Sequence, residues 1–308
     1  MQLAQSTQSI LMVRPSNFHF NAQTSQSNAY MQASQLTESE QNYLARQEFS
    51  TLADKLVVAG VDVLVVDDTP VPETPDAIFP NNWISMHHDG TLITYPMEAP
   101  NRRLERKNTV LDSISARFEV RKRIQLEGLE SNQHYLEGTG SIVFDHHQQI
   151  GFAGISTRTH RDALRELSQH ISYQFIEFDA VDRNQNPIYH TNVLMGVGSE
   201  FACVCLDAIV DAQQKKRLSD ALAAGNKKIV PITHAQVASF CGNLLELRDG
   251  NNEPLIVMSQ EAWQGYDHQQ QKLLESYGSV LFSAIPTIEH HAGGSVRCMI
   301  AEIFLPRL

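Results

Sequence analysis

The sequence predicts a mixed α/β fold, and three observations support that class. Short apolar runs of strand length recur along the whole chain, and longer segments with helical periodicity lie between them. Hydrophobic residues make up 42% of the 308 positions and charged residues 19%, so the chain can bury a full core. Because barrels and propellers of this length often form one unit, we expect a single domain over residues 1–308.

The strand-like runs are short and lie next to turn residues or helical patterns. They are Ile10–Val13, Val61–Val66, Ile142–Phe144, Ile150–Ala153, Val193–Val197, Phe201–Leu206, Leu255–Met258, Val280–Ser283 and Met299–Phe304. A hairpin is predicted as well, because Asp89-Gly90 separates two further short runs. Alternation in a strand would place Cys203 and Cys205 on one face, which favours core packing over a metal site.

Helical periodicity is predicted in five segments, each bracketed by two or three strands. They are Glu38–Ala59, Arg102–Ala116, Arg161–His170, Asp207–Ala224 and Glu261–Tyr277. Thr37 stands three residues before Glu40, which is the spacing of a capping box, and Gly60 is a plausible C-terminal cap. The third helix starts after Thr159, and Asp207 is expected to cap the fourth as the chain leaves a strand.

Two features of organisation remain open from the pattern alone. A doubly wound parallel sheet is one possible arrangement. The chain has no G-x-G-x-x-G or P-loop motif, so no sequence motif supports nucleotide binding. The polar segment 21–36 lies between a strand and a helix, and we expect it to be a loop or lid.

Charge and hydropathy exclude several classes of protein. The net charge is −11 and the longest basic cluster is Arg121-Lys122-Arg123, which argues against nucleic-acid binding. The N-terminus lacks the basic start and apolar run of a signal peptide. No apolar stretch reaches the roughly 18 residues that a membrane span requires. We therefore expect a cytoplasmic protein without membrane or nucleic-acid partners.

The segment HHAGGSVRC, which ends at Cys298, is the first candidate for chemistry. Two glycines and a serine permit a tight turn that presents the thiol, and Arg297 beside it would favour the reactive thiolate. The alternative is a buried structural cysteine. His190 enters an apolar run, and Glu137 lies in a glycine-rich turn where a buried carboxylate needs a partner.

Together, Cys298, His190 and Glu137 suit a nucleophile, a proton shuttle and an orienting acid. A cysteine peptidase would use the same residue types, so these three do not name the reaction. Arg102 and Arg158 lie in loops beside proline or glycine, and arginine forks are suited to binding a substrate carboxylate. Surface arginines are the alternative for both.

Several segments occur in the order seen in guanidine-modifying enzymes, which include arginine deiminases, dimethylarginine hydrolases and amidinotransferases. They are PDAIFPNN at 75–82, PNRR at 100–103, LEG at 136–138, G-x-S-x-RT at 154–159, His190, and the glycine pair 293–294 before Cys298. With its PNNW, EGTGS and HTN motifs, the chain from Arg14 onward most resembles the arginine-deiminase-related citrulline hydrolase branch. The resemblance implies a five-bladed α/β propeller of ββαβ units around a central polar site.

The resemblance also implies a role for each matched residue. Cys298 would be the nucleophile, His190 the general acid and then base, and Glu137 the group that orients His190. Asp76 would bind the amino acid, and Arg102 and Arg158 its α-carboxylate. The chain departs from the enzymes that it resembles at Asn81 and Asn82, where dimethylarginine hydrolases carry acids, and at Asn192, where arginine deiminases carry aspartate.

These departures favour a neutral substrate, because a buried carboxylate facing a ureido group would keep an uncompensated charge. We therefore expect hydrolysis of citrulline to ornithine, carbon dioxide and ammonia, with no metal, nucleotide or redox cofactor. The same site acting on arginine or methylarginine would give citrulline, and an amidinotransferase is a weaker alternative. A non-catalytic amino-acid-binding propeller would not need a nucleophile, and a peptidase would leave both arginines unexplained. The expected partner is a small amino acid, and a homodimer is left open.

Overall fold

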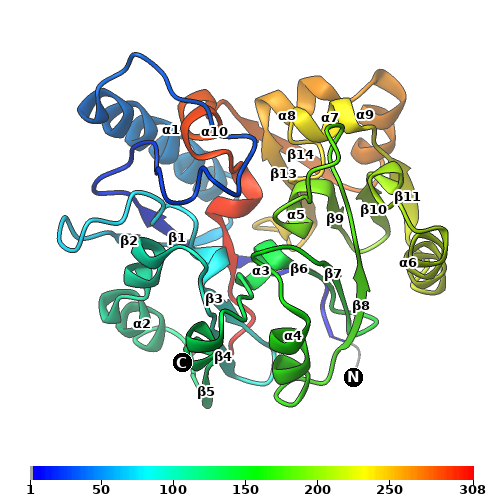
Figure 1. The fold of residues 1–308 in the computed structure, drawn as a ribbon, viewed down its shortest axis with the longest axis horizontal. Helices are drawn as coiled ribbons and strands as arrows, with labels where there is room; N and C mark the ends of the chain where they lie inside the picture. Colours follow the sequence, from blue (N-terminus) through cyan, green and yellow to red (C-terminus); the bar gives the residue numbers. More distant parts are fainter. Residues whose placement is uncertain (1–2) are drawn as a thin grey trace.

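The computed structural model describes residues 3–308 as a mixed α/β structure, as the sequence predicts. The strands form five separate three-stranded sheets, so the doubly wound single sheet is wrong. In each sheet an antiparallel pair is joined to a third strand that runs parallel to the middle one. The sheets follow one another around the centre of the molecule, with the longer helices on the outside (Figure 1).

Each unit consists of three strands and the helical segment before its last strand. The first has β1 (Ser9–Arg14), α1 (Glu38–Val58), β2 (Asp62–Asp67) and, from the far end of the chain, β15 (Ala301–Glu302). The second has β3 (Ile84–Met86), β4 (Thr91–Thr94), α2 (Asn108–Ser115) and β5 (Lys122–Gln125). The third has β6 (Ile142–Asp145), β7 (Ile150–Gly154), α4 (Arg161–Ser168) and β8 (Gln174–Phe178). The fourth has β9 (Met195–Val197), β10 (Phe201–Val204), α6 (Ala212–Ala224) and β11 (Lys228–Pro231). The fifth has β12 (Leu245–Arg248), β13 (Pro254–Ser259), α8 (Gln260–Gly265), α9 (His268–Glu275) and β14 (Ser279–Ser283).

Short helical turns precede the first strand of four units. They are η1 (Pro80–Asn82) before β3, α3 (Gly138–Ser141) before β6, α5 (Thr191–Leu194) before β9 and η5 (Val296–Met299) before β15. The fifth unit has a turn at 240–243 before β12 instead. Because η5 contacts η1, η1 contacts α3, and α3 contacts α5, these turns meet near the centre of the molecule (Figure 1).

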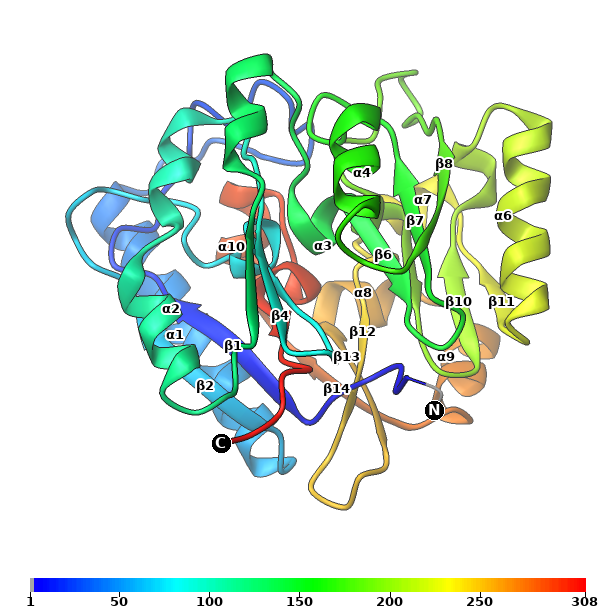
Figure 2. The same cartoon turned by 90° about the horizontal axis from the view of Figure 1, so that it is seen from below.

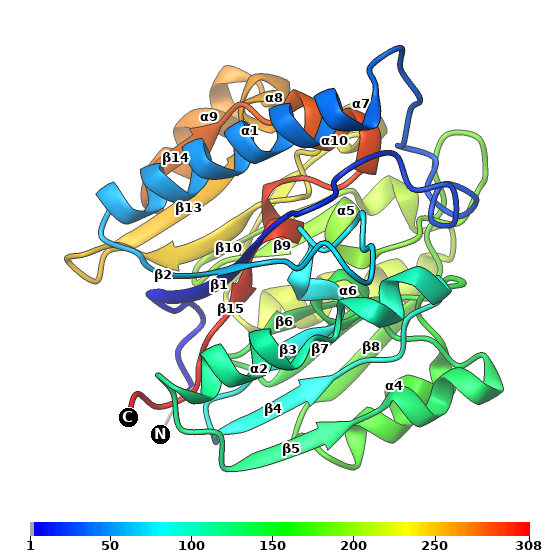
Figure 3. The same ribbon diagram turned by 90° about the vertical axis from the view of Figure 1, so that its left-hand side faces the viewer.

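Helix α1 shows how an outer helix is held in place. Phe49, Leu52 and Leu56 are fully buried in one apolar cluster with Ile10 and Met12 of β1. Burial of each such side chain contributes about 1.5–3 kcal/mol. Figure 3 shows α1 lying along the outside of the molecule above β1 and β2. The capping box between Thr37 and Glu40 is present, so this prediction is confirmed.

Other predicted helices differ at their boundaries. The segment 102–116 is divided into η2 (Pro100–Glu105) and α2, because Lys107 is extended and starts a new helix. The segment 261–277 is divided into α8 and α9, because Asp267 caps the second of these helices. The predicted cap Asp207 is wrong, because Asp207 lies in η4 (Leu206–Ala208) and Asp211 caps α6; α4 starts after Thr159, as predicted, and is capped by His160.

The segment 21–36 contains turns but no helix or strand, so the loop prediction is confirmed. Figure 2 shows this N-terminal segment on the same side of the molecule as α10 (Pro286–Ala292), the helix that leads toward Cys298. Cys203 and Cys205 are fully buried in the core, as predicted. Within residues 3–308, no helix combines the length and apolar character needed to cross a membrane.

Candidate active site

A small cavity lies where the short turns meet. Six of the predicted site residues line it, together with six that were not predicted: Asp76, Asn82, Arg102, Arg158, His190 and Cys298, with Thr24, Asn28, Phe79, Tyr189, Ala292 and Gly294. All twelve residues are buried. The predicted Glu137 and Asn192 contact lining residues directly, whereas Asn81 reaches the cavity only through its hydrogen bond with Asn82.

Glu137 and His190 form a buried pair at the start of α3 and α5. Nε2 of His190 lies 2.9 Å from Oε2 of Glu137, and the carboxylate can only accept, so Nε2 carries the proton. Burial lowers the pKa of His190 to about 4, against the opposing effect of Glu137. Burial alone would raise the pKa of Glu137, but Arg158, His190 and Arg102 outweigh it and lower the pKa to about 2. The pair is therefore a neutral imidazole oriented by a carboxylate.

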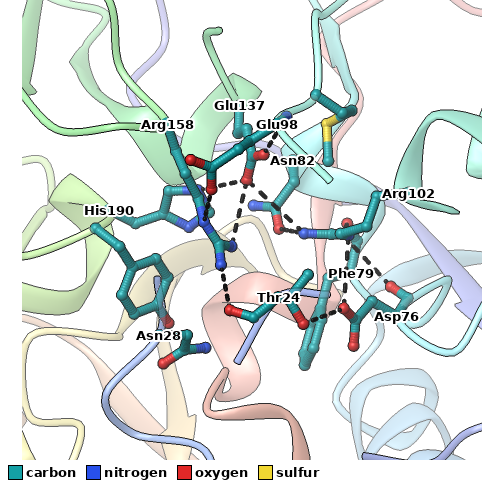
Figure 4. A network of polar contacts seen from close by, with 12 residues as sticks. Thr24, Asn28, Asp76, Phe79, Asn82, Glu98, Arg102, Glu137, Arg158 and His190 are labelled. Carbon is teal, nitrogen blue, oxygen red and sulfur yellow. Dashed lines mark hydrogen bonds and ion pairs between the residues drawn. The ribbon is translucent and has the colours of Figure 1, made fainter. Parts of the chain in front are cut away.

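Arg158 is held between this pair and the loop at 21–36 (Figure 4). Its Nη1 lies 3.5 Å from Oε2 of Glu137, and its Nε lies 3.2 Å from Oε2 of Glu98. Nη2 donates to the carbonyl of Thr24 at 2.9 Å and to Oγ of Ser27 at 2.8 Å. The guanidinium also lies 4.9 Å above the ring of Tyr189, within range of a cation–π contact.

Arg102 is held by a different set of partners. Its Nε and Nη2 donate to the two carboxylate oxygens of Glu105 at 2.8 and 3.0 Å. Its Nη1 donates to Oδ1 of Asn82 at 2.8 Å, and its Nε lies 3.8 Å from Oδ2 of Asp76. Nε and Nη2 of Arg102 are thus occupied by Glu105, and its Nη1 holds the side chain of Asn82 at the cavity wall.

Two side-chain amides surround the sulfur of Cys298. Nδ2 of Asn192 and Nδ2 of Asn243 each donate to Sγ at 3.3 Å. The expected contact from Arg297 is wrong, because its guanidinium donates to the carbonyl of Ile300 at 2.9 Å and to Glu302 at 3.0 Å. The arginine next to the cysteine therefore points away from the sulfur and stabilises the segment behind it.

Two buried acceptors at the site have no hydrogen-bond partner in the described protein. Oδ2 of Asp76 accepts from Asn21 at 2.8 Å and from Thr24 at 3.0 Å, while Oδ1 has no donor. Asn192 uses its amide nitrogen on Cys298 and leaves Oδ1 unpaired. A buried unpaired acceptor costs about 1–3 kcal/mol, so both oxygens are suited to a ligand that brings N–H donors.

Glycines allow the turns to approach the reactive side chains. A Cβ on Gly140 would lie 2.8 Å from two ring atoms of His190. Gly293 has φ +60°, a left-handed conformation that favours glycine, and it ends α10 before the turn that carries Cys298. The sequence signals for both turns were the glycine pairs themselves.

The sequence reasoning missed several residues of the site. Asn243, Glu98 and Glu105 contact its predicted residues directly, and Thr24 and Tyr189 line the cavity. Of these residues, only Tyr189 could have been found from the sequence, because it directly precedes His190. The others come from segments with no recognisable motif. A larger and more open cleft, lined in part by Tyr30, contains neither Cys298 nor His190 among its lining residues.

Among residues 3–308, one group has the spacing of metal ligands, and it lies outside the cavity. His134, His160 and Asp162 offer ligand atoms within 4.8 Å of one another. None of the three lines the cavity, and Nδ1 of His160 already accepts from the backbone N–H of Asp162 at 3.1 Å. We therefore assign no metal to the candidate active site.

The fold is shared with solved structures of low sequence identity. A cysteine-to-serine mutant of the N-terminal domain of ArgZ, an arginine dihydrolase from the ornithine–ammonia cycle in Cyanobacteria, bound to substrate, matches with a TM-score of 0.75 and 15% identity over 97% of this chain and 99% of that one. Full-length ArgZ gives a TM-score of 0.74 at 16% identity, and this chain spans 41% of its length. A dimethylarginine dimethylaminohydrolase adduct with S-methyl-L-thiocitrulline gives 0.64 at 12% identity, over 96% of this chain and 99% of that one. No curated protein sequence matches significantly.

Five small α/β units around a buried cysteine, histidine and glutamate define a guanidine-modifying enzyme of the amidinotransferase type. Within that class, the profile of the N,N dimethylarginine dimethylhydrolase, eukaryotic, family matches residues 14–305, and the chain belongs to this family. The resemblance to guanidine-modifying enzymes inferred from the motifs is therefore confirmed. The chain is accordingly a hydrolase that acts on carbon–nitrogen bonds other than peptide bonds, as the sequence predicts.

Proposed function

We propose that the chain hydrolyses free citrulline to ornithine, carbon dioxide and ammonia through a covalent intermediate on Cys298. The pairing of the buried carboxylates is the observation that carries this choice of substrate. Glu137 is paired with His190 and lies near Arg158, while both oxygens of Glu105 are held by Arg102. Among the acids that line or adjoin the cavity in the described structure, Asp76 alone keeps a buried carboxylate oxygen without a donor.

The single unpaired carboxylate oxygen of the cavity, Oδ1 of Asp76, can accept from one cationic group of the substrate. The α-ammonium of a free amino acid is a suitable donor for Oδ1 of Asp76. No second unpaired carboxylate oxygen then remains among the buried acids of the cavity for a guanidinium cation. A neutral ureido group needs acceptors for its N–H groups and no counter-charge, and Oδ1 of Asn192, beside the sulfur, is such an acceptor.

The α-carboxylate of the substrate is assigned to Arg158. Its ion-pair partner Glu98 has a side chain that is 26% exposed, whereas the partner of Arg102, Glu105, is almost fully enclosed. A carboxylate entering beside the 21–36 loop can therefore compete for Arg158 at lower cost than for Arg102. Arg102 contributes to substrate binding indirectly in this proposal, because it holds Asn82 and Asp76 at the wall of the cavity.

The mechanism has two halves that share one thiolate and one imidazole. The unprotonated Nδ1 of His190 takes the thiol proton of Cys298, and the thiolate attacks the ureido carbon. The carbon–nitrogen bond to the terminal amide then breaks as the imidazolium gives that proton to the leaving ammonia. This leaves a thiocarbamate on the sulfur. His190 then takes a proton from water, the hydroxide adds to the carbonyl carbon, and the carbon–sulfur bond breaks. The released carbamate decomposes to carbon dioxide and ornithine.

Five repeated units also support a propeller as the architecture. Each sheet carries the same strand directions, and each first strand starts from a turn at the centre. In a propeller these sheets are the blades, and the turns that hold Asn82, Glu137, His190, Asn243 and Cys298 surround the central axis. The assignment explains why five distant segments supply one cavity.

Dimethylarginine is the second candidate substrate, because the matching family takes its name from that activity. The test is to measure ornithine, citrulline, ammonia and dimethylamine after incubation with citrulline, arginine or dimethylarginine. Citrulline hydrolysis predicts ornithine and ammonia from citrulline, with the highest kcat/KM of the three. Citrulline as the end product from arginine or dimethylarginine, with no turnover of citrulline, would contradict the proposal.

Cys298→Ser is the matched control for the covalent step. A serine hydroxyl is far less ionised than a thiol near neutral pH, so turnover on every substrate should be lost while the fold is retained. Intact mass spectrometry of the wild type quenched during turnover should show a thiocarbamate adduct, which the variant lacks. More than about a tenth of wild-type activity in the variant, roughly 1.4 kcal/mol of barrier, would rule out Cys298 as the nucleophile.

A further inference from the structure

Four of the five central turns carry residues that the family resemblance assigns. These are Asn82 from η1, Glu137 at the start of α3, His190 and Asn192 at α5, and Cys298 from η5. The fifth turn, at 240–243 before β12, has no assigned residue. It ends in Asn243, whose side chain is 1% exposed.

Three hydrogen bonds fix the side chain of Asn243. Its Oδ1 accepts from the backbone N–H of Arg297 at 3.0 Å, which ties it to the residue just before the cysteine. Its Nδ2 donates to the carbonyl of Asn192 at 3.0 Å and to Sγ of Cys298 at 3.3 Å. The amide group is therefore oriented by η5 on one side and α5 on the other.

The sulfur needs these amide donors because neither Arg297 nor His190 donates a hydrogen bond to it. Arg297 points away from it, and Nε2 of His190 donates to Glu137. A buried thiolate without hydrogen bonds or a counter-charge is unfavourable, since burial favours the neutral thiol. In the described structure the N–H donors that contact Sγ are the two amides, Asn192 and Asn243.

We infer that Asn243 is a catalytic residue that stabilises and aims the Cys298 thiolate, with Asn192 as the second donor. The inference rests on the proposed covalent chemistry at Cys298. In the first half of the reaction the amides hold the sulfur with a lone pair directed into the cavity. In the second half the carbon–sulfur bond breaks and its electron pair returns to sulfur, so the same donors stabilise the leaving thiolate. An aspartate could do neither, because a carboxylate would repel the thiolate.

The test is the pH dependence of Cys298 alkylation by iodoacetamide, which reports the thiolate fraction and requires no amino-acid substrate. Reaction of the other three cysteines is subtracted with Cys298→Ala. In Asn243→Ala the midpoint should move to higher pH by about one unit, since a hydrogen bond to a charged group is worth that much. The value of kcat on citrulline should fall at least about tenfold at neutral pH, with a smaller change in KM.

Asn243→Asp separates this role from a structural one. It keeps the shape of the side chain and the acceptor for the Arg297 N–H, so a purely structural role predicts milder effects than those of Asn243→Ala. A thiolate donor predicts the reverse order, with the midpoint of the Asp variant at the highest pH, because its charge repels the sulfur. Asn192→Ala removes only the second donor and should shift the midpoint in the same direction.

Thermal unfolding of each variant shows whether the alkylation profile comes from folded protein. If Asn243→Ala does not fold, the comparison of Asn243→Asp and Asn192→Ala with the wild type decides the question. Unchanged alkylation midpoints in folded variants, whatever happens to kcat, would overturn the inference. Failure of citrulline as a substrate would leave the alkylation result intact, so the two proposals fail separately.

Discussion

The two cavity arginines differ in what holds them, although their sequence contexts looked equivalent. Arg102 forms a bidentate, enclosed pair with Glu105, whereas Arg158 contacts the partly exposed Glu98 and the 21–36 loop. Removing one member of a buried pair leaves an uncompensated charge, which costs about 3–5 kcal/mol. The two residues should therefore respond differently to the same substitution.

We predict that Arg158→Ala lowers kcat/KM for citrulline at least about tenfold more than for the decarboxylated amine analogue. The reason is that only citrulline carries the carboxylate that Arg158 binds in the proposal. Arg102→Ala is the comparison: it should lower activity on both substrates equally and reduce the melting temperature, because Glu105 loses its partner. Equal losses on both substrates in Arg158→Ala would mean that Arg158 does not bind the carboxylate.

A second residue-level prediction concerns substrate charge. Asn82→Asp places a carboxylate beside His190 and Arg102, where it can pair with a cationic substrate. The ratio of kcat/KM for arginine to that for citrulline should rise about tenfold or more, as a charge-assisted contact contributes about 1.5–3 kcal/mol. Both substrates are assayed at several pH values. An active variant with an unchanged ratio would contradict the charge-matching argument.

Asn192→Asp is a poorer test of substrate charge than its sequence position suggested. Its amide touches the sulfur, so aspartate would suppress the thiolate whichever substrate is used. The sequence identified Asn192 as a site residue and related it to the substrate. Its contact with Cys298 depends on how α5 and η5 meet, which no local pattern in either segment encodes.

At the scale of single elements, α10 carries a buried acid that the reaction does not use. Glu289 is 7% exposed, and it accepts a hydrogen bond from Ser295 at 2.7 Å. Burial raises the pKa of Glu289 to about 7, and the nearby charges of Glu261 and Glu48 add to that effect, while hydrogen bonds from serines oppose it. The folded protein therefore holds this proton more tightly than the unfolded chain does.

This shift predicts how folding stability depends on pH. As pH rises from about 4.5 through about 7, the unfolded chain loses the proton first, so Glu289 lowers the free energy of unfolding over that range. Glu289→Gln should therefore stabilise the protein at pH 8 by about 2–3 kcal/mol, with little difference below pH 4.5. Urea unfolding at both pH values measures this.

Glu275→Gln is a matched control, because Glu275 is exposed on α9 and is not among the charges that act on Glu289. It should change the free energy of unfolding by no more than about 0.5 kcal/mol at either pH. If Glu289→Gln destabilises the protein equally at both pH values, Glu289 acts through its hydrogen bond to Ser295 and not through its charge. That outcome would contradict the prediction.

The sequence predicted the inner elements better than the outer ones. Middle strands such as β7 and β13 are buried and apolar, so their runs were visible. The third strands β5, β8 and β11 were missed, as was the first strand β12; β5 has one buried residue, Ile124, so it shows no apolar run. The last two residues of α5, Val193 and Leu194, and the last residue of η5, Met299, were predicted as strand, because these apolar residues are buried and show no helical period.

At the scale of the whole molecule, the first unit joins the two ends of the chain. Strand β15 pairs with β1 at Ile10↔Glu302 and Leu11↔Ala301, only three residues after Cys298. Ile303 follows: its N–H donates to Ser9 O at 2.9 Å, and it forms a bridge with Met86 of the second unit. The position of Cys298 therefore depends on closure of the ring of units by the C-terminal segment.

Closure by so short a strand raises the question of whether the C-terminal segment can detach alone. Val296, Met299 and Ile300 are fully buried in the cluster that contains Phe49 and Leu52 of α1, so detachment would expose part of the core. We therefore predict one cooperative unfolding transition. In denaturant, alkylation of Cys298 should follow the loss of far-UV circular dichroism with the same midpoint.

Ile303→Ala tests the prediction of a single transition at the point where the two ends of the chain join. Ile256→Ala in β13 is its control, because both isoleucines are at most 2% exposed. Each should lower the free energy of unfolding by about 2–5 kcal/mol. If closure is cooperative, Cys298 alkylation and circular dichroism keep a common midpoint in both variants. If Cys298 of Ile303→Ala reacts at denaturant concentrations where the circular dichroism is still native, the C-terminal segment opens by itself. In that case the reactive cysteine would be held by the local contacts of η5, including those with Asn192 and Asn243, and not by closure of the ring.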